Sequence, residues 1–356
     1  EGRFYEDGEL KDKVAAMRPY KKWREKIRDF DTLLADRADE SARMDRDTLR
    51  RRQVAVGWTI EDLELILHPM VEEQKEPTGS MGDDAPLAVL SDNYRGLHHF
   101  FRQSFSQVTN PAIDSLRERG VMSLTTRLGN LGNILETAES GGTILQLSSP
   151  VLLNGEFEAM CGHLGASAVA IDCTFDPSEK PNALRNAILR IRTETEDAVR
   201  GGCTHVILTD EGVDAERVAV PMILATGAVH THLVRTSLRT YVSINVRSAE
   251  CLDVHYVAVL IGVGATTVNP YLAQEAIADR YGKGLFGSLG YAEALQRYRR
   301  AVDDGLLKVM SKMGISVISS FRGGYNFEAV GLSRTLVGQF FPGLPSRISG
   351  IGLDGN

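Results

Sequence analysis

The sequence has few cysteines, and none of them forms a C-x-x-C pair. The four are Cys161, Cys173, Cys203 and Cys251, scattered over the middle of the chain. Metal and iron–sulfur sites need clustered thiolates, so this spacing argues against a cysteine-ligated centre. It predicts buried, reduced thiols of a cytoplasmic protein.

Long apolar runs and an excess of positive charge are also missing. No run approaches the ~20 apolar residues that a membrane-spanning helix needs, and no charged-then-apolar leader opens the chain. Because the chain begins at Glu1, we expect a mature, trimmed or excised polypeptide. The net charge of -7 argues against nucleic-acid binding, and we expect Arg50-Arg51-Arg52 to be the solvated face of a helix.

Familiar catalytic and cofactor motifs are absent from these 356 residues. There is no G-x-S-x-G, no Walker A sequence and no activated Cys/His arrangement. "GVGATT", residues 262–267, follows a predicted helix and precedes a predicted strand, the reverse of the order that binds phosphate, so it is interpreted as a helix stop. His230 with His232, and His98 with His99, are expected to pack rather than bind metal.

The first third of the chain is charged and reads as helical. Residues 10–26 are amphipathic, and a second helix is expected to begin at Thr59, whose hydroxyl can cap it, and to be kinked or ended by Pro69. Residues 72–86 read as a loop. With 43% hydrophobic residues, the whole chain can bury a full core.

From about residue 141, short strands rich in β-branched residues alternate with helices. Strands are expected at 143–150, 168–175, 205–212, 241–248, 265–269, 315–319 and 347–353, with helices at 182–199, 218–238 and before Gly264 and Gly314. This alternation predicts an α/β fold with a parallel sheet. A (β/α)8-like, TIM-type barrel, complete or distorted and preceded by a mainly helical N-terminal segment, is favoured over an open sheet.

Polar side chains lie at the C-terminal ends of the predicted strands, where an α/β barrel would carry its active site. They are Asp172, Thr209, Asp210, Glu211, Asn245, Arg247, Asn269, Ser319, Ser320 and Arg322. In a catalytic interpretation, Asp172 or Asp210 is a general base and Arg247 or Arg322 binds an anion. In the simpler interpretation, which we favour, they are caps and turns.

Five long motifs resemble the central domain of the glutamate synthase large (alpha) subunit. They are "ELILHPMVEEQKEPTGSMGDDAPLAVLS", "LHHFFRQSFSQVTNPAIDSLRERGVMSL", "TEDAVRGGCTHVILTDE", "YVAVLIGVGATTVNPYLAQEAI" and "DGLLKVMSKMGISVISSFRGG". The resemblance implies a barrel-like domain without flavin. It divides the chain into 1–27, the tail of an amidotransferase domain; 28–140, a helical and loop part; 141–300, a barrel-like part; and 301–356, the last β/α units leading toward an FMN-binding synthase domain.

The resemblance also implies partners and cofactors, none of them held by this segment. In the family, an amidotransferase domain releases ammonia from glutamine, and ammonia crosses an internal tunnel to 2-oxoglutarate at FMN, beside a three-iron four-sulfur (3Fe-4S) cluster. A small subunit carries FAD, 4Fe-4S clusters and NADPH. The segment alone is then expected to be a non-catalytic part of an oxidoreductase, with an NADPH-dependent parent favoured over a ferredoxin-dependent one.

The same resemblance assigns residues to the tunnel. Met81 of "SMGDD" and Thr109 of "VTNP", with Asn110 beside it, match positions near the synthase end of the tunnel. A flexible Met and weakly bonding Thr and Asn side chains suit the passage of neutral ammonia. Asp83, Asp84 and Arg322 are expected in structural or interface roles. Ala112 stands where the family usually has a second proline, and "RGGYNF" replaces a more usual Gly-Ala-Gln, so geometry near both loops is expected to differ.

Two other functions stay open at this point. One is a free-standing barrel enzyme that acts on a small anionic substrate through Asp210, Arg247 or Arg322. The other is an interaction module that docks separately onto amidotransferase and synthase partners.

Overall fold

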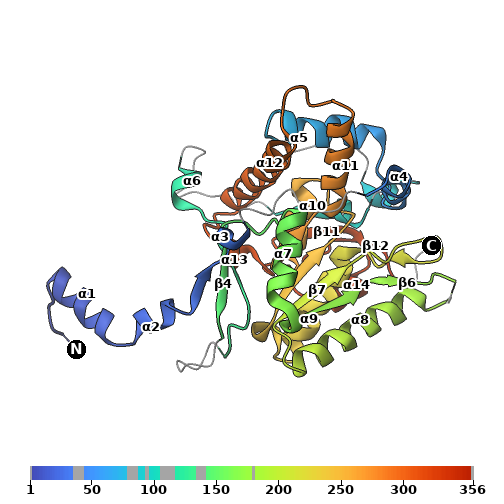
Figure 1. Ribbon diagram of the computed structural model, residues 1–356. Helices are drawn as coiled ribbons and strands as arrows, with labels where there is room; N and C mark the ends of the chain where they lie inside the picture. Colours follow the sequence, from blue (N-terminus) through green and yellow to red (C-terminus); the bar gives the residue numbers. More distant parts are fainter. Residues whose placement is uncertain are drawn as a thin grey trace.

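The computed structural model describes residues 2–34, 44–77, 87–92, 96–104, 117–133, 142–178 and 181–353. Its centre is a four-stranded sheet in the order β10-β9-β7-β5 (Figure 1). The strands are β5 (Ala168–Asp172), β7 (His205–Thr209), β9 (Ser243–Arg247) and β10 (Thr267–Asn269), and every pairing is parallel. The predicted parallel α/β sheet is therefore confirmed.

Helices connect these strands as the alternation predicts. α8 (Ala183–Arg200) and α9 (Met222–Arg235) join β5 to β7 and β7 to β9, and α10 (Val254–Gly262) joins β9 to β10. Short strands β6 (Thr174–Phe175) and β8 (Val218–Ala219) pair antiparallel beside the sheet. The right-handed crossover of parallel strands requires connections of this length.

Strand β7 explains why these strands read as continuous apolar runs. Val206 and Leu208 lie in the main core, which includes buried residues of α8 and α9, whereas Ile207 lies in a second core with Phe157 and Met160 of α7 (Asn154–Leu164). Successive side chains of a strand point to opposite faces. Because both faces are covered, neither set of positions can be polar throughout.

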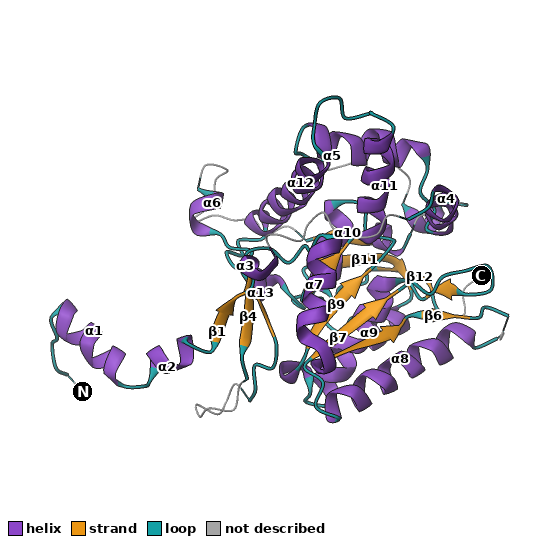
Figure 2. Cartoon of the chain, viewed as in Figure 1, coloured by secondary structure: helices purple, strands orange, loops and turns teal. Residues whose placement is uncertain are grey.

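The other strands form separate sheets. β1 (Ile27–Asp29), β4 (Ile144–Leu147) and β3 (Thr126–Leu128) form one, with β4 central, and β2 (Phe101–Gln103), β11 (Phe327–Leu332) and β12 (Ile348–Ile351) form another, with β11 central. Figure 2 shows β1 and β4 apart from the central sheet. Within the described ranges the strands do not close into a barrel, so the predicted barrel is not confirmed. The division into four segments also remains a prediction.

One predicted strand is wrong. Residues 315–319 contribute only an isolated bridge between Val317 and Ser123, and Ile318–Phe321 form the short helix α13. The apolar alternation of this stretch does not make a strand because Ser319 and Ser320 are exposed and no neighbouring strand continues the pairing. The preceding helix, α12 (Tyr291–Lys312), ends as expected before Gly314, whose φ is 69°.

A helical layer lies above the sheet in Figure 1. It contains α4 (Arg46–Ala55), α5 (His68–Glu72), α11 (Tyr271–Gly282) and α12, and α5 and α11 both contact α12. The predicted helix after Thr59 is present, with the Thr59 hydroxyl accepting from the Asp62 N–H at 3.3 Å. A widened π-helical turn, Asp62–Leu67, precedes Pro69 and accommodates its missing N–H.

The N-terminal residues form an arm that leaves the body of the molecule (Figure 1). α1 (Asp7–Ala16) and α2 (Tyr20–Arg24) contain no buried residue. The single helix predicted over 10–26 is divided before α2, where Pro19 cannot continue it. The remaining short helices are α3 (Asp31–Leu34), α6 (Glu118–Val121) and α14 (Arg334–Phe340).

Candidate functional site

The carboxyl edge of the central sheet gathers most of the polar residues singled out in the sequence. Strand register aligns one residue from each strand in a single row: Asp172, Thr209, Arg247 and Asn269. Because aligned residues in neighbouring strands share a face, these four side chains lie side by side. The prediction that these residues lie at the carboxyl edge of the sheet is therefore correct. Their hydrogen bonds and ion pairs decide whether a ligand can reach them.

Arg247 is enclosed by residues from three other elements. Its Nε lies 2.9 Å from Oε1 of Glu211, in the loop after β7. Its guanidinium carbon lies 5.1 Å from the ring centre of Phe157 and 5.3 Å from that of Tyr271. An arginine held between a carboxylate and two aromatic faces is balanced in charge and fixed in position. It is not a free anion-binding group.

Asp172 is similarly engaged, although it is closer to solvent. Its Oδ2 accepts from Nη2 of Arg217 at 2.8 Å, and its Oδ1 accepts from the Thr174 N–H and hydroxyl. Arg190 donates to the backbone carbonyls of Asp172 and Thr174, both at 2.9 Å. Both arginines that reach Asp172 therefore have local partners.

Asp210 is the most deeply buried acid of the edge, with 1% of its surface exposed. It accepts from the Ala249 N–H at 2.8 Å and from the Ser248 hydroxyl at 3.0 Å. Burial, and then the nearby Glu250 carboxylate, raise the pKa of Asp210 to about 7, although the bonds it accepts oppose this. Such a pKa suits a general base, but Asp210 is bonded to groups of the protein itself and is buried away from solvent.

Arg52 of α4 covers this edge from above. Its Nη1 donates to the Tyr271 hydroxyl at 2.6 Å, and its Nη2 donates to the Glu211 carbonyl at 2.7 Å. Arg50 and Arg51 are exposed, as the sequence predicts for a solvated helix face, but Arg52 is half-buried. Sequence patterns did not indicate this role of Arg52, nor the roles of Tyr271, Phe157 and Arg217. The burial of Leu49, one turn earlier, marks the side of α4 that faces inward.

The rest of the row continues as a buried polar ladder. Asn269 donates through Nδ2 to the Leu152 carbonyl at 2.9 Å and to Oδ1 of Asn154 at 3.0 Å. Two residues earlier along the same two strands, the Thr267 hydroxyl donates to Oδ1 of Asn245 at 2.7 Å. The bonds of Asn269 connect the row to α7 and its preceding loop, and the buried Oδ1 of Asn269 has no hydrogen-bond partner among the described residues.

Arg322 lies at the opposite edge of the sheet. Its neighbourhood contains His230 and Arg239, because Gly323 packs against the His230 ring and the charge of Arg322 lowers the pKa of Arg239. Arg239 in turn donates to the carbonyls of Val242 and Gly264, which precede β9 and β10. Grouping Arg322 with Arg247 and Asp210 was therefore wrong, because residues 315–319 do not form a strand of this sheet.

The predicted tunnel residues cannot be compared with the structure. Met81, Thr109 and Asn110 lie outside the described residues, and so do Asp83 and Asp84. The described segment 96–104, which precedes Thr109 in the sequence, contains β2. This strand pairs antiparallel with β11, and the Ser104 N–H donates to the Asn326 carbonyl at 3.1 Å. The assignment of Met81, Thr109 and Asn110 to a tunnel remains a prediction.

The histidines and cysteines show no metal-binding arrangement in the described part of the chain. His232 pairs with Glu196, and His230 accepts a hydrogen bond from Arg239. The ring centre of His98 lies 4.9 Å from that of Tyr256. All four cysteines are free thiols, and burial raises the pKa of each, for Cys161 to about 11. Because no three ligating side chains come together among the described residues, these thiols do not fit an iron–sulfur cluster.

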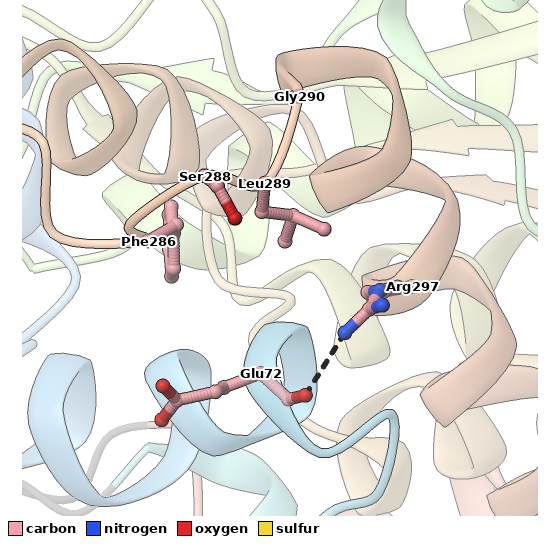
Figure 3. A pocket seen from close by; sticks show the side chains of 6 residues that line it. All are labelled: Glu72, Phe286, Ser288, Leu289, Gly290 and Arg297. Carbon is pink, nitrogen blue, oxygen red and sulfur yellow. Dashed lines mark hydrogen bonds between the residues drawn. The ribbon is translucent and has the colours of Figure 1, made fainter.

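Two of the surface hollows lined by described residues do not resemble an active site. Figure 3 shows the first, of about 330 Å³, where Arg297 donates to the Glu72 carbonyl at 3.1 Å while the Glu72 carboxylate points away. That carboxylate lies 3.4 Å from Nε2 of His68. The second, of about 400 Å³, lies near the amino edge of the sheet and includes Asn130, Arg200 and Tyr241. Neither combines a base with a nucleophile or an anion-binding pair.

No helix in the described ranges is both long and apolar enough to cross a bilayer.

Among solved structures, a pyruvate-bound mutant flavocytochrome b2 aligns with a TM-score of 0.42 and 10% identity, over 79% of this chain and 91% of that one. A likeness of this strength carries no argument about the fold or function.

Sequence comparison is much more informative. Residues 51–333 match the model of the glutamate synthase central domain. The chain is 64% identical over 99% of its length to the NADPH glutamate synthase large chain of Azospirillum brasilense, and 40% identical to that of Bacillus subtilis. It is 39% identical to the chloroplastic ferredoxin-dependent glutamate synthase of spinach (Spinacia oleracea).

The chain corresponds to one part of each of these longer relatives. The chain covers 24%, 23% and 22% of the lengths of these three relatives, so it corresponds to about a quarter of each. The family model, by contrast, covers most of this chain. The chain belongs to the glutamate synthase central domain family.

Proposed function

We propose that this chain is the connecting domain of a glutamate synthase. It links a glutaminase domain to an FMN-containing synthase domain and helps to form the tunnel through which ammonia reaches 2-oxoglutarate. The observation that carries the proposal is family membership over residues 51–333, in a chain that spans only a quarter of its relatives. The proposed tunnel residues are Met81, Thr109 and Asn110.

The closed carboxyl edge of the sheet supports a role other than catalysis. In an α/β enzyme this edge holds the substrate. Here Asp172 and Asp210 accept hydrogen bonds from neighbouring protein groups, and Arg247 forms an ion pair with Glu211, although its Nε has no hydrogen-bond partner among the described residues. The free-standing enzyme considered above needs at least one of these groups to face a substrate. This arrangement therefore favours a connecting role.

The N-terminal arm supports a place within a longer polypeptide. Phe4, Leu10, Val14 and Met17 are exposed by 90%, 46%, 47% and 66%. Exposed apolar side chains on a projecting helix usually mark a surface that another protein part covers. We propose that the preceding amidotransferase domain covers this arm, and that the parts after β12 lead toward the synthase domain.

The cofactors of the proposed parent enzyme belong to its other parts. FMN and the 3Fe-4S cluster would lie in the synthase domain, and FAD, 4Fe-4S clusters and NADPH in a small subunit. The residues of this chain do not fit a flavin at the sheet edge, because Arg52, Arg217 and Arg247 already have partners there. The higher identity to NADPH enzymes than to ferredoxin-dependent ones supports an NADPH-dependent parent.

The test is a blocked tunnel in the complete enzyme. In Met81→Trp, we expect glutamine hydrolysis to continue while glutamine-dependent glutamate formation falls at least about tenfold, and synthesis from added ammonia to be less affected. Leu189→Trp, at an exposed position on α8, is the matched control. Equal loss of all three activities in Met81→Trp, or no loss at all, would contradict the tunnel assignment.

A further inference from the structure

Arg322 presents an unused hydrogen-bonding edge. Its backbone N–H donates to the Ile318 carbonyl at 2.9 Å, which fixes the residue at the end of α13. Its Nε and Nη2 are buried and have no hydrogen-bond partner among the described residues. These two nitrogens lie on the same side of the guanidinium, the side that binds a carboxylate or phosphate through two parallel bonds.

The neighbouring Arg239 does not balance this charge. It donates to three neutral acceptors: Nδ1 of His230 at 3.0 Å and the carbonyls of Val242 and Gly264 at 2.7 and 2.9 Å. A guanidinium has five N–H groups, so two of those on Arg239 are still available. Burial, and then the charge of Arg322, lower the pKa of Arg239 to about 9.

His230 lies between the two arginines and is held neutral. Its Nδ1 accepts from Arg239, and its ring is wedged between two glycines: a Cβ on Gly264 would come within 2.4 Å of the ring, and one on Gly323 within 2.8 Å. Burial, and then the charges of Arg239 and Arg322, lower its pKa to about 3. His230 therefore spaces the arginines and adds no charge. Both glycines have positive φ, 126° and 66°, so the fit depends on their missing side chains.

The cluster also includes Tyr325, but no described acid. The Tyr325 hydroxyl bonds Oγ1 of Thr231 at 3.1 Å, and its ring centre lies 6.0 Å from that of His230. Burial alone lowers the pKa of Arg322, to about 10, with no carboxylate to oppose it. An unpaired buried charge is costly, and orphaned donors in a native protein usually mean that a bound ion or water belongs there.

We propose that Arg322 and Arg239 form a binding site for an oxyanion of carboxylate geometry at the amino edge of β9 and β10. The anion bonds side-on to Nε and Nη2 of Arg322 and takes a further bond from Arg239. It comes either from a free small carboxylate or from an acidic side chain elsewhere in the complete polypeptide. The site lies at the edge opposite Asp210 and Arg247, and it depends on neither the tunnel nor the connecting role.

The experiment uses the complete polypeptide that contains these residues, dialysed into chloride buffer. Succinate and sulfate are titrated at constant ionic strength, and the thermal unfolding midpoint is followed. A free anion that binds the folded state raises the midpoint saturably. We expect about tenfold weaker binding in Arg322→Lys, which loses the two-bond geometry, and no saturable rise in Arg322→Gln. Arg200→Gln, at an exposed arginine paired with Glu196, should respond like the wild type.

The same variants identify the source of the anion. A saturable rise in the wild type that is lost in Arg322→Gln indicates a free oxyanion. If the wild type does not respond to either anion and Arg322→Gln is less stable than Arg322→Lys, the partner is an acidic side chain of the polypeptide. If the anions have no Arg322-dependent effect and Arg322→Gln is at least as stable as the wild type, the proposal is overturned. Anomalous scattering from selenate-soaked crystals then checks the position of a free anion beside Nε and Nη2.

Discussion

Nε of Arg247 lies 2.9 Å from Oε1 of Glu211, across the carboxyl edge of the central sheet. Glu211 lies in the loop after β7, and Arg247 is the last residue of β9. This contact therefore ties β7 to β9 where an α/β enzyme would hold substrate. Arg52 completes the closure, because its Nη2 donates to the carbonyl of the same Glu211. The edge thus works as an internal joint between the sheet and the helical layer.

Removing Arg52 should loosen that joint. In Arg52→Ala, the Tyr271 hydroxyl and the Glu211 carbonyl each lose a charge-assisted bond, and we expect the free energy of unfolding to fall by about 1–3 kcal/mol. Arg51→Ala is the control, because Arg51 is exposed and bonds only within its own helix. Urea unfolding measures both. Equal effects of the two substitutions would mean that Arg52 acts as an ordinary surface residue.

Asp210 should make stability depend on pH. Its folded pKa, about 7, is above the ordinary 3.8, so the folded state keeps a proton that the unfolded state releases as pH rises from 4. Stability therefore falls between about pH 4 and 7 and stays reduced above that range. In Asp210→Asn this contribution is absent. The difference in free energy of unfolding between wild type and Asp210→Asn should therefore change by on the order of 3 kcal/mol between pH 4 and 8.

Comparison of the two proteins isolates Asp210 from other acids with raised pKa values. Burial raises the pKa of Glu76 and of Asp303 to about 7, so the wild type and Asp210→Asn share their contributions. Asp12→Asn, on the exposed arm, serves as control and should follow the wild-type curve. Parallel stability curves for wild type and Asp210→Asn would show that Asp210 ionises normally.

Much of the central sheet could be predicted from sequence because its signals are local. The run containing Val206, Ile207 and Leu208 reads as a strand buried on both faces, and α8 and α9 show helical periodicity on either side of it. Sheet closure depends on which distant strands pair, and local patterns do not contain that information. Missing information on distant pairing also explains why Arg322 was placed at the wrong edge of the sheet. Residues 315–319 are strand-like in sequence, but among the described residues they form a single bridge, between Val317 and Ser123.

The candidate residues at the sheet edge could be located but not interpreted. Asp172, Asp210 and Arg247 follow strands, which is visible in the sequence. Their partners Arg217, Ser248 and Phe157 come from other loops and helices, and only the folded chain brings them together. A polar residue after a strand therefore indicates position, whereas availability for chemistry depends on tertiary contacts.

Two glycines should respond oppositely to alanine substitution. A Cβ on Gly227 of α9 would come within 2.3 Å of the Phe341 ring, so Gly227→Ala should lower the free energy of unfolding by about 1–3 kcal/mol. Gly338 of α14 has open space around it, and Gly338→Ala should raise stability by up to about 1 kcal/mol through its better helix propensity. Chemical denaturation of both variants checks the close packing of α9 against α14. A neutral Gly227→Ala would mean that the helices do not approach so closely.

The arm and the strand that follows it should differ sharply in their contribution to stability. Removal of residues 2–24 takes away α1 and α2, which have no buried residue, so we expect the thermal midpoint to stay within about 1 °C of the intact chain. Removal through Asp29 also deletes β1, which pairs with β4 beside the fully buried Phe30, and should lower the midpoint by several degrees. Calorimetry of the two deletions makes the comparison. If the shorter deletion already destabilises the protein as much as the longer one, the arm packs on this chain and does not await a neighbouring domain.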